Sequence, residues 1–235
     1  TTSKMLYDKG YKVLTIDFRH PELSNHINIL EPVICEYEKY IKYENLVNTA
    51  TNENERLDYQ NKSISSYAET NRLITSLASM ITYDKSQGKD PFWNNSAKNL
   101  LEGLIGFFLE EYKDGKINRE QITMTSIRKF QNSTMEEKNS KKFKSYIEQK
   151  PYGTKSKDSL VPILSSSENT YKSITSVFSE KMAIFDDVNV ANVTSKSDFD
   201  FDILGKEKSA LFVIVPDEDK VYYSLVTIIL GLLYK

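Results

Sequence analysis

The residues with the clearest chemical character form a basic segment in the second half of the chain. Ten lysine or arginine residues lie between positions 119 and 157, against four acidic ones: Glu120, Glu136, Glu137 and Glu148. The basic residues are Arg119, Arg128, Lys129, Lys138, Lys141, Lys142, Lys144, Lys150, Lys155 and Lys157. Lysine and arginine bind phosphates and release condensed counterions. The segment therefore predicts a local surface that attracts a polyanion.

Three aromatic residues, Phe143, Tyr146 and Tyr152, are interleaved with these lysines. Aromatic faces stack unpaired bases at roughly 1–3 kcal/mol per base. We therefore predict a nucleic-acid contact made by Phe143 or Tyr146 together with Lys138, Lys141, Lys142 and Lys144. The alternative is that Phe143 belongs to the core and the lysines are only solvated.

No set of residues in the sequence predicts catalysis. The chain contains no G-x-x-x-x-G-K-[ST] phosphate loop, no G-x-G-x-x-G turn and no G-x-S-x-G elbow. A serine or cysteine triad needs a histidine base, and the two histidines, His20 and His26, share one loop. With Cys35 they also make a poor zinc site. We expect both histidines to be surface or loop-packing residues.

The segment Asp198–Asp202 places carboxylates at alternate positions, as a calcium loop does. Such a loop also needs Gly at its sixth position and Glu at its twelfth. Those positions hold Ile203 and Ser209. We therefore expect the aromatic residues of this segment to pack inward and the aspartates to face water.

Composition excludes several classes of protein. The net charge of −2 gives no global nucleic-acid signature. A single cysteine rules out an internal disulfide and fits a reducing compartment. The longest apolar stretch, Leu225–Tyr234, is shorter than the roughly 20 residues that a membrane span needs, and the N-terminus lacks the layout of a signal peptide. We expect a soluble chain.

Two strands are predicted near the ends, at Tyr11–Phe18 and Ser209–Val215, the second followed by an apolar helix. Continuous apolar runs are typical of strands buried on both faces of a parallel sheet. Because a stable sheet needs more members, we interpret the chain as a fragment in which a helical domain is inserted into a larger α/β domain.

Helical periodicity dominates the residues between the strands. One helix is predicted from Pro32, one around Tyr67–Ile81, and the strongest from Asp90, with Gly103 and Gly106 allowing close approach of another backbone. Two shorter helices are expected within 119–150, and another around Tyr171–Phe185. We expect a loop or frayed helix at 48–63 and loops at 84–90, 151–167 and 186–207.

The order of these elements resembles the coupling ATPases of type IV secretion and conjugation, the TraG/TraD-like family. The matching segments are Gly10–Pro21 with Ser24 and Asn28, Asp90–Ala97 with the leucine-rich helix after it, and Lys208–Asp217 with the helix from Leu225. One departure is that Asn28-Ile29-Leu30 stands where the family usually has Asn-Pro-Leu.

This resemblance implies a mainly α fold, in which a helical bundle is flanked by remnants of an α/β RecA-like nucleotide-binding domain. The implied division is 1–31 for the first remnant, 32–195 for the all-α domain and 196–235 for the returning strand and helix. Both Walker motifs would lie outside the chain, so the fragment itself should need no cofactor and hydrolyse no ATP. ATP and Mg²⁺ are implied for a hexameric parent.

The function implied by the resemblance is substrate recognition on the cytoplasmic side of the bacterial membrane. The partners would be a relaxase or relaxosome, secreted protein cargo and other channel components, with single- or double-stranded DNA as a direct ligand. A competing hypothesis is a protein-docking module with no nucleic-acid contact. The net acidic charge favours docking, whereas the basic segment favours DNA.

Overall fold

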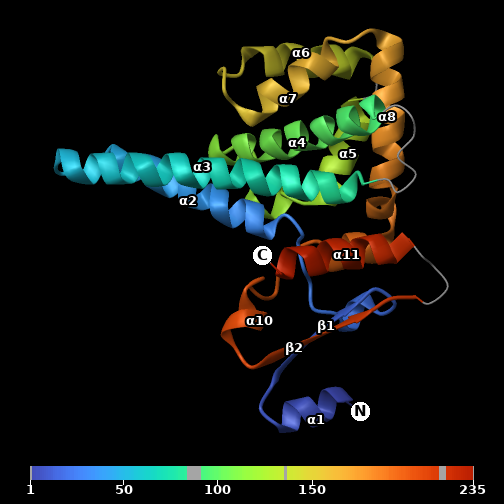
Figure 1. The fold of residues 1–235 in the computed structure, drawn as a ribbon. Coiled ribbons are helices and arrows are strands. Elements are labelled where there is room, and N and C mark those ends of the chain that lie inside the picture. The colour runs from blue at the N-terminus through green and yellow to red at the C-terminus, as the bar shows by residue number, and fades with distance from the viewer. Residues whose placement is uncertain (1, 84–90, 135–136, 217–220, 235) are drawn as a thin grey trace.

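The computed structural model describes residues 2–83, 91–134, 137–216 and 221–234. Within these ranges the chain forms eleven α-helices and one two-stranded sheet, so the molecule is mainly α, as predicted. Most of the helices lie above the sheet and α1 lies below it, while α6 and α7 occupy the end of the molecule farthest from the sheet (Figure 1). The division at residues 31 and 195 stays a prediction.

The sheet joins the two ends of the chain. Strands β1 (Lys12–Asp17) and β2 (Ser209–Ile214) run parallel, with Lys12 opposite Ser209 and Asp17 opposite Ile214. The predicted parallel pairing is confirmed. Helix α1 (Thr2–Asp8) precedes β1, and the short helices η1 (Pro21–Leu23) and α10 (Ile203–Lys206) flank the strands in sequence.

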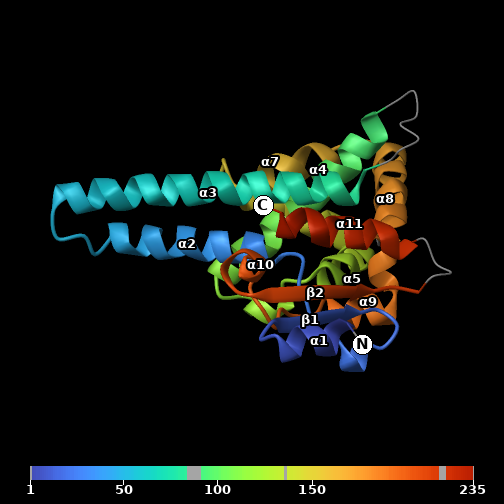
Figure 2. The same cartoon turned by 60° about the horizontal axis from the view of Figure 1, so that its bottom comes forward.

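A long helical hairpin, α2 (Glu31–Val47) and α3 (Glu53–Ile81), projects beyond the other elements (Figure 2). The predicted loop or frayed helix at 48–63 was wrong for most of its length, because α3 begins at Glu53. The side chain of Asn52 accepts a hydrogen bond from the backbone N–H of Glu55 (3.0 Å) and caps the helix. Packing against α2 then stabilises a helical turn that the polar sequence alone does not favour.

Helix α4 (Phe92–Lys113) is the centre of the core, and its residues 100–109 are all buried. The predicted helix start at Asp90 and the predicted loop at 84–90 lie outside the described residues. The close approach predicted at the two glycines is confirmed. A Cβ on Gly103 would lie 2.5 Å from Leu160 Cγ, and one on Gly106 would lie 2.8 Å from Lys155 Cβ.

The neighbour at these glycines is α7 (Lys155–Leu164), so the loop predicted at 151–167 was wrong for most of its length. Ser and Pro favour turns and loops, and Pro162 even lies inside the helix. Leu160 and Ile163 are buried, and Glu110 of α4 accepts a hydrogen bond from the backbone N–H of Ser156 at the helix start (3.0 Å). Contacts with α4 therefore stabilise a helix in a segment whose local sequence favours a loop.

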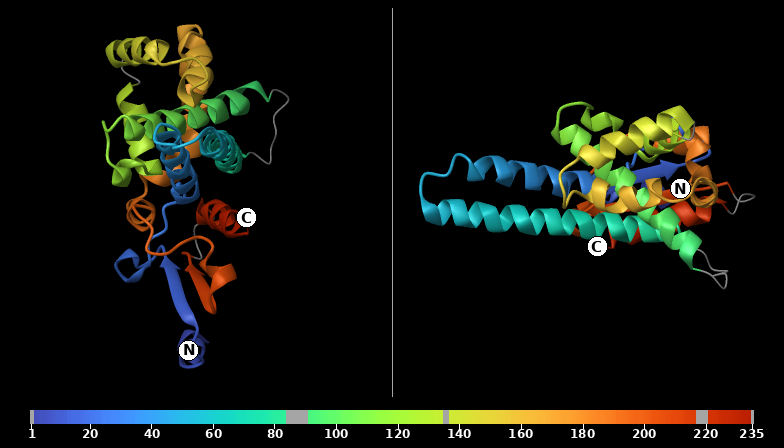
Figure 3. Two further views of the ribbon diagram at one scale, coloured as in Figure 1. Left: turned by 90° about the vertical axis from the view of Figure 1, so that its left-hand side faces the viewer. Right: turned by 90° about the horizontal axis from the view of Figure 1, so that it is seen from above.

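The remaining helices follow the predictions more closely. Helices α5 (Met124–Thr134) and α6 (Glu137–Gln149) lie within 119–150 after η2 (Arg119–Gln121), and α8 (Glu168–Met182) leads into η3 (Ala183–Asp186). The connector expected at 186–207 contains α9 (Val188–Val193) as well as α10. Helix α11 (Val221–Leu233) follows β2 and packs against α3 (Figure 3). None of the helices in the described ranges is long and apolar enough to cross a bilayer.

Candidate nucleic-acid interface

Helix α6 is amphipathic, and its two faces carry different chemistry. Phe143 and Ile147 are buried, whereas Lys138, Lys141 and Lys142 are exposed. Positions three and four apart share a helix face, so these lysines form one outward strip on the side opposite Ile147. We call Lys138, Lys141, Lys142 and the flanking Lys144 the α6 lysine face.

Phe143 does not belong to this exposed face. Its side chain is 8% exposed and packs edge-on against Phe107 and Phe130, with ring centroids 5.2 and 5.1 Å away. The ring is therefore a core contact and is not available to stack a base. This placement corrects the prediction for Phe143, because an aromatic residue between lysines gives no sign of which way it points until the helix is docked.

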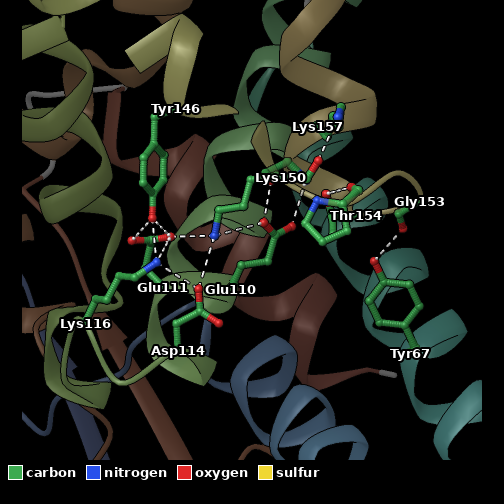
Figure 4. Close-up of polar contacts among 12 residues, drawn as sticks. Tyr67, Glu110, Glu111, Asp114, Lys116, Tyr146, Lys150, Gly153, Thr154 and Lys157 are labelled. Atoms are coloured by element: carbon green, nitrogen blue, oxygen red, sulfur yellow. Dashed lines mark hydrogen bonds and ion pairs between the residues drawn. The ribbon is translucent and has the colours of Figure 1, made fainter. Parts of the chain in front are cut away.

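Tyr146 is 36% exposed, but its hydroxyl is engaged inside the protein. It donates to the carboxylate of Glu111 (2.8 Å) and accepts from the ammonium of Lys116 (2.6 Å) (Figure 4). Its ring also meets Phe107 edge-on, with the ring centroids 6.1 Å apart. In this structure Tyr146 anchors α6 to α4.

Lys150 joins the same polar cluster, at the end of α6 (Figure 4). Its ammonium lies 2.5 Å from Glu111, 3.5 Å from Asp114 and 3.8 Å from Glu110, and its side chain is only 10% exposed. Burial disfavours the charged form, but the hydrogen bond to Glu111 and the nearby carboxylates raise the pKa of Lys150 above its ordinary value. Lys150 is therefore a charged structural residue.

Several other residues of the basic segment are held in internal contacts. Arg119 bonds Glu31 (2.6 Å) and Glu38 (2.9 Å), and Arg128 bonds Asp186 (3.0 Å). The ammonium of Lys155 donates a hydrogen bond to Glu102, and that of Lys157 donates to the backbone carbonyls of Glu148 and Lys150. Together with Lys150, these residues are half of the ten basic ones. Four of them pair with carboxylates, whereas Lys157 is held by neutral backbone carbonyls and keeps its positive charge.

Two lysines of the α6 lysine face differ from these five residues. Among the described residues, Lys138 and Lys142 have no ion-pair partner, and Lys144 lies 3.9 Å from Glu148 on the flank of the helix. Lys138 also lies in the first turn of α6, where the macrodipole is positive and a further cation is unfavourable. The face thus concentrates positive potential and can bind an anionic polymer.

The two histidines considered in the sequence analysis make contacts with neighbouring acidic residues. His20 is exposed, 3.5 Å from Glu22. His26 bonds Asp198 through its ring Nδ1 (2.8 Å) and its backbone N–H (2.9 Å), which ties the loop after β1 to the segment before β2. Burial opposes the charge of Asp198, but the hydrogen bonds from His26 and Lys196 lower its pKa.

The predicted inward packing of the aromatic residues near Asp198 is confirmed. Phe199 is 7% exposed, and Phe201 packs against the core. A polar hollow of about 370 Å³ is lined here by residues that include Asp198, Asp200 and Asp202. In the part of the chain that the structure describes, no three His, Cys, Asp or Glu side chains gather in a way that could hold a metal ion.

Comparison with known proteins identifies the family. No curated protein matches the chain. A family model described as type IV secretory system conjugative DNA transfer matches residues 1–234. Because this match covers nearly the whole sequence, the resemblance found in the strand and helix motifs is confirmed, and the chain belongs to the family of type IV secretory system conjugative DNA transfer proteins.

Proposed function

We propose that this chain recognises the substrate in conjugative DNA transfer, by recruiting a relaxase–DNA complex or protein cargo to the secretion channel. The family match supports the general process. The observation that carries the specific proposal is the α6 lysine face, which is exposed on the side of α6 opposite the buried Ile147. In this proposal the lysines contact DNA phosphates.

Electrostatic attraction to DNA would come from the α6 lysine face and not from the protein as a whole. The whole chain carries a net charge of −2, so a polyanion gains nothing from the average field of the protein. Neutralisation of phosphates by the α6 lysine face would release counterions and make affinity fall with salt. DNA binding by this face should therefore be weak at high ionic strength.

We further propose that the chain does not hydrolyse ATP by itself. Its sequence has no G-x-x-x-x-G-K-[ST] loop to hold nucleotide phosphates. ATP, Mg²⁺ and the hexameric arrangement would belong to a larger assembly on the cytoplasmic side of the membrane, which this chain supplies with substrate.

The test is fluorescence-anisotropy binding of a labelled single-stranded oligonucleotide at increasing salt. The charge-reversal variant Lys138→Glu/Lys142→Glu should lose binding. A matched control is Lys4→Glu/Lys9→Glu, which makes the same charge change on exposed residues in and just after α1, at the other end of the molecule (Figure 1). Equal affinity of the two variants would refute DNA contact by the α6 lysine face.

A protein-docking function without nucleic-acid contact is the second candidate, and the projecting hairpin favours it. Leu57 and Ile64 of α3 are 54% and 69% exposed and lie seven positions apart, on one helix face. Docking through such residues should survive moderate salt. Pull-down of a relaxase by the native chain, but not by Leu57→Ser/Ile64→Ser, would favour this function.

A further inference from the structure

The turn between α6 and α7 exposes an aromatic residue of the basic segment. The side chain of Tyr152 is 90% exposed, whereas Phe143 is buried and the hydroxyl of Tyr146 is bonded within the protein. Of the three aromatic residues interleaved with the lysines, Tyr152 alone has most of its ring surface available. An exposed ring of this kind can stack a base on the face away from Lys157 without losing a contact of the fold.

The turn that carries Tyr152 is held at several points. Gly153 adopts φ +81°, a left-handed conformation that favours glycine. The hydroxyl of Tyr67 donates to the Gly153 carbonyl (3.2 Å), and Thr154 Oγ1 donates to the Pro151 carbonyl (2.9 Å) (Figure 4). A ring on an ordered turn loses little entropy when a ligand binds.

Lys157 adds a positive charge at the same place. Its ammonium lies 3.9 Å from the centroid of the Tyr152 ring. It also donates to the carbonyls of Glu148 (2.8 Å) and Lys150 (2.7 Å), which fixes it at the C-terminal end of α6. The turn thus combines an exposed ring with a held cation, and it follows directly from the helix that bears the α6 lysine face.

We propose that Tyr152 stacks an unpaired base of single-stranded DNA whose phosphates lie along the α6 lysine face. From Lys138 to Gln149, α6 is about 16 Å long at about 1.5 Å per residue. This length matches about five nucleotides if the single strand keeps the rise of about 3.4 Å per nucleotide of one strand in B-DNA. Duplex DNA could not stack a base on Tyr152, because the faces of its bases are covered by the neighbouring bases. This inference rests on the proposed DNA contact.

The test compares binding of a labelled ten-nucleotide single strand, the same strand with abasic positions, and a duplex of the same sequence. The native chain should bind the intact single strand most tightly. Tyr152→Ala should weaken that binding by about 5- to 150-fold and should abolish the preference for the intact strand over the abasic one. Tyr152→Trp should retain the affinity for the intact strand and the preference over the abasic one, because it keeps an aromatic face.

The control is Tyr7→Ala, which removes another exposed tyrosine (71%) on the distant helix α1. It should bind like the native chain. If Tyr152→Ala binds normally while Lys138→Glu/Lys142→Glu does not, the stacking inference is wrong and the proposed function stands. If the native chain binds no strand at low salt, both are wrong. Thermal unfolding of each variant checks that the fold is kept.

Discussion

Lys142 and Lys150 belong to the same basic segment, but their surroundings give them different roles. Lys142 is exposed on α6, whereas Lys150 is 10% exposed and contacts Glu111, which is 9% exposed. Removal of one partner from a buried ion pair leaves the other charge desolvated and uncompensated. Stability and ligand binding should therefore depend on different lysines.

We predict that Lys150→Met lowers the free energy of unfolding by about 3 kcal/mol, because the carboxylate of Glu111 keeps only its contacts with Tyr146 and Lys116. Lys142→Met should change it by less than about 0.5 kcal/mol. Urea unfolding of the two variants measures the difference. Identical midpoints would show that the Glu111–Lys150 pair does not stabilise the docking of α6.

Cys35 should react slowly despite being partly exposed. Burial and the negative charge of Glu31, which accepts a hydrogen bond from the thiol at 3.4 Å, raise the pKa of Cys35 to about 11. Because the thiolate is the reactive form, reaction with a disulfide reagent at neutral pH should be much slower in the folded chain than in urea. The rate should rise as the pH approaches the raised pKa.

Glu31→Gln is the matched variant for this prediction, since it removes the charge but keeps an amide near the thiol. Its reaction should be faster than that of the native chain at every pH below the raised pKa. Equal rates for folded and unfolded native chain at neutral pH would contradict the raised pKa.

At the scale of elements, the crossing of α4 and α7 depends on the absence of two side chains. Gly103 and Gly106 lie on one face of α4, where the start and middle of α7 approach it. The contact positions α7, and α7 together with α6 forms the hairpin that carries the α6 lysine face and Tyr152. A substitution at the α4–α7 crossing should therefore alter the position of the proposed DNA interface, although neither glycine belongs to that interface.

Gly103→Ala should lower the free energy of unfolding by about 1–3 kcal/mol, although alanine is the better helix former. The cause is the Cβ contact of 2.5 Å with Leu160. Gly205→Ala is the control, because no atom lies within 4 Å of its Cβ position. In a double-mutant cycle, Leu160→Ala should reduce the cost of Gly103→Ala. Additive effects would mean that the helices adjust elsewhere.

At the scale of the whole molecule, the α6 lysine face and the sheet lie at opposite ends (Figure 1). The chain is slightly acidic as a whole, so long-range attraction of DNA is weak and the ionic contacts should be few. A ligand on α6 would also be held away from β1 and β2.

The salt dependence of binding should report this small number of contacts. If the four lysines of the α6 lysine face each neutralise one phosphate, log K should fall with log salt with a slope of about −3 for single-stranded DNA. Anisotropy titrations between low and moderate salt measure the slope. A slope of about −1 would mean that most of the four lysines contact no phosphate, and a much steeper slope would require phosphate contacts outside the α6 lysine face.

The sequence by itself determined the elements with strong local patterns. The patterns at Tyr11–Phe18 and Ser209–Val215 predicted the parallel strands, and the spacing of apolar residues from Trp93 to Phe108 predicted α4. Ordered motifs along the chain were sufficient to predict the family. Such patterns are readable because backbone geometry repeats over a few residues.

Only the tertiary structure decided which residues of the basic segment are exposed. Phe143 and Tyr152 are both aromatic residues among lysines, yet one is 8% and the other 90% exposed. Helix α7 forms because Gly103 and Gly106 of α4 leave room for its close approach, and because Glu110 accepts a hydrogen bond from its first turn. Lys150 and Lys155 are likewise structural because carboxylates of α4 lie beside them, and burial and ion pairing depend on contacts that no local pattern contains.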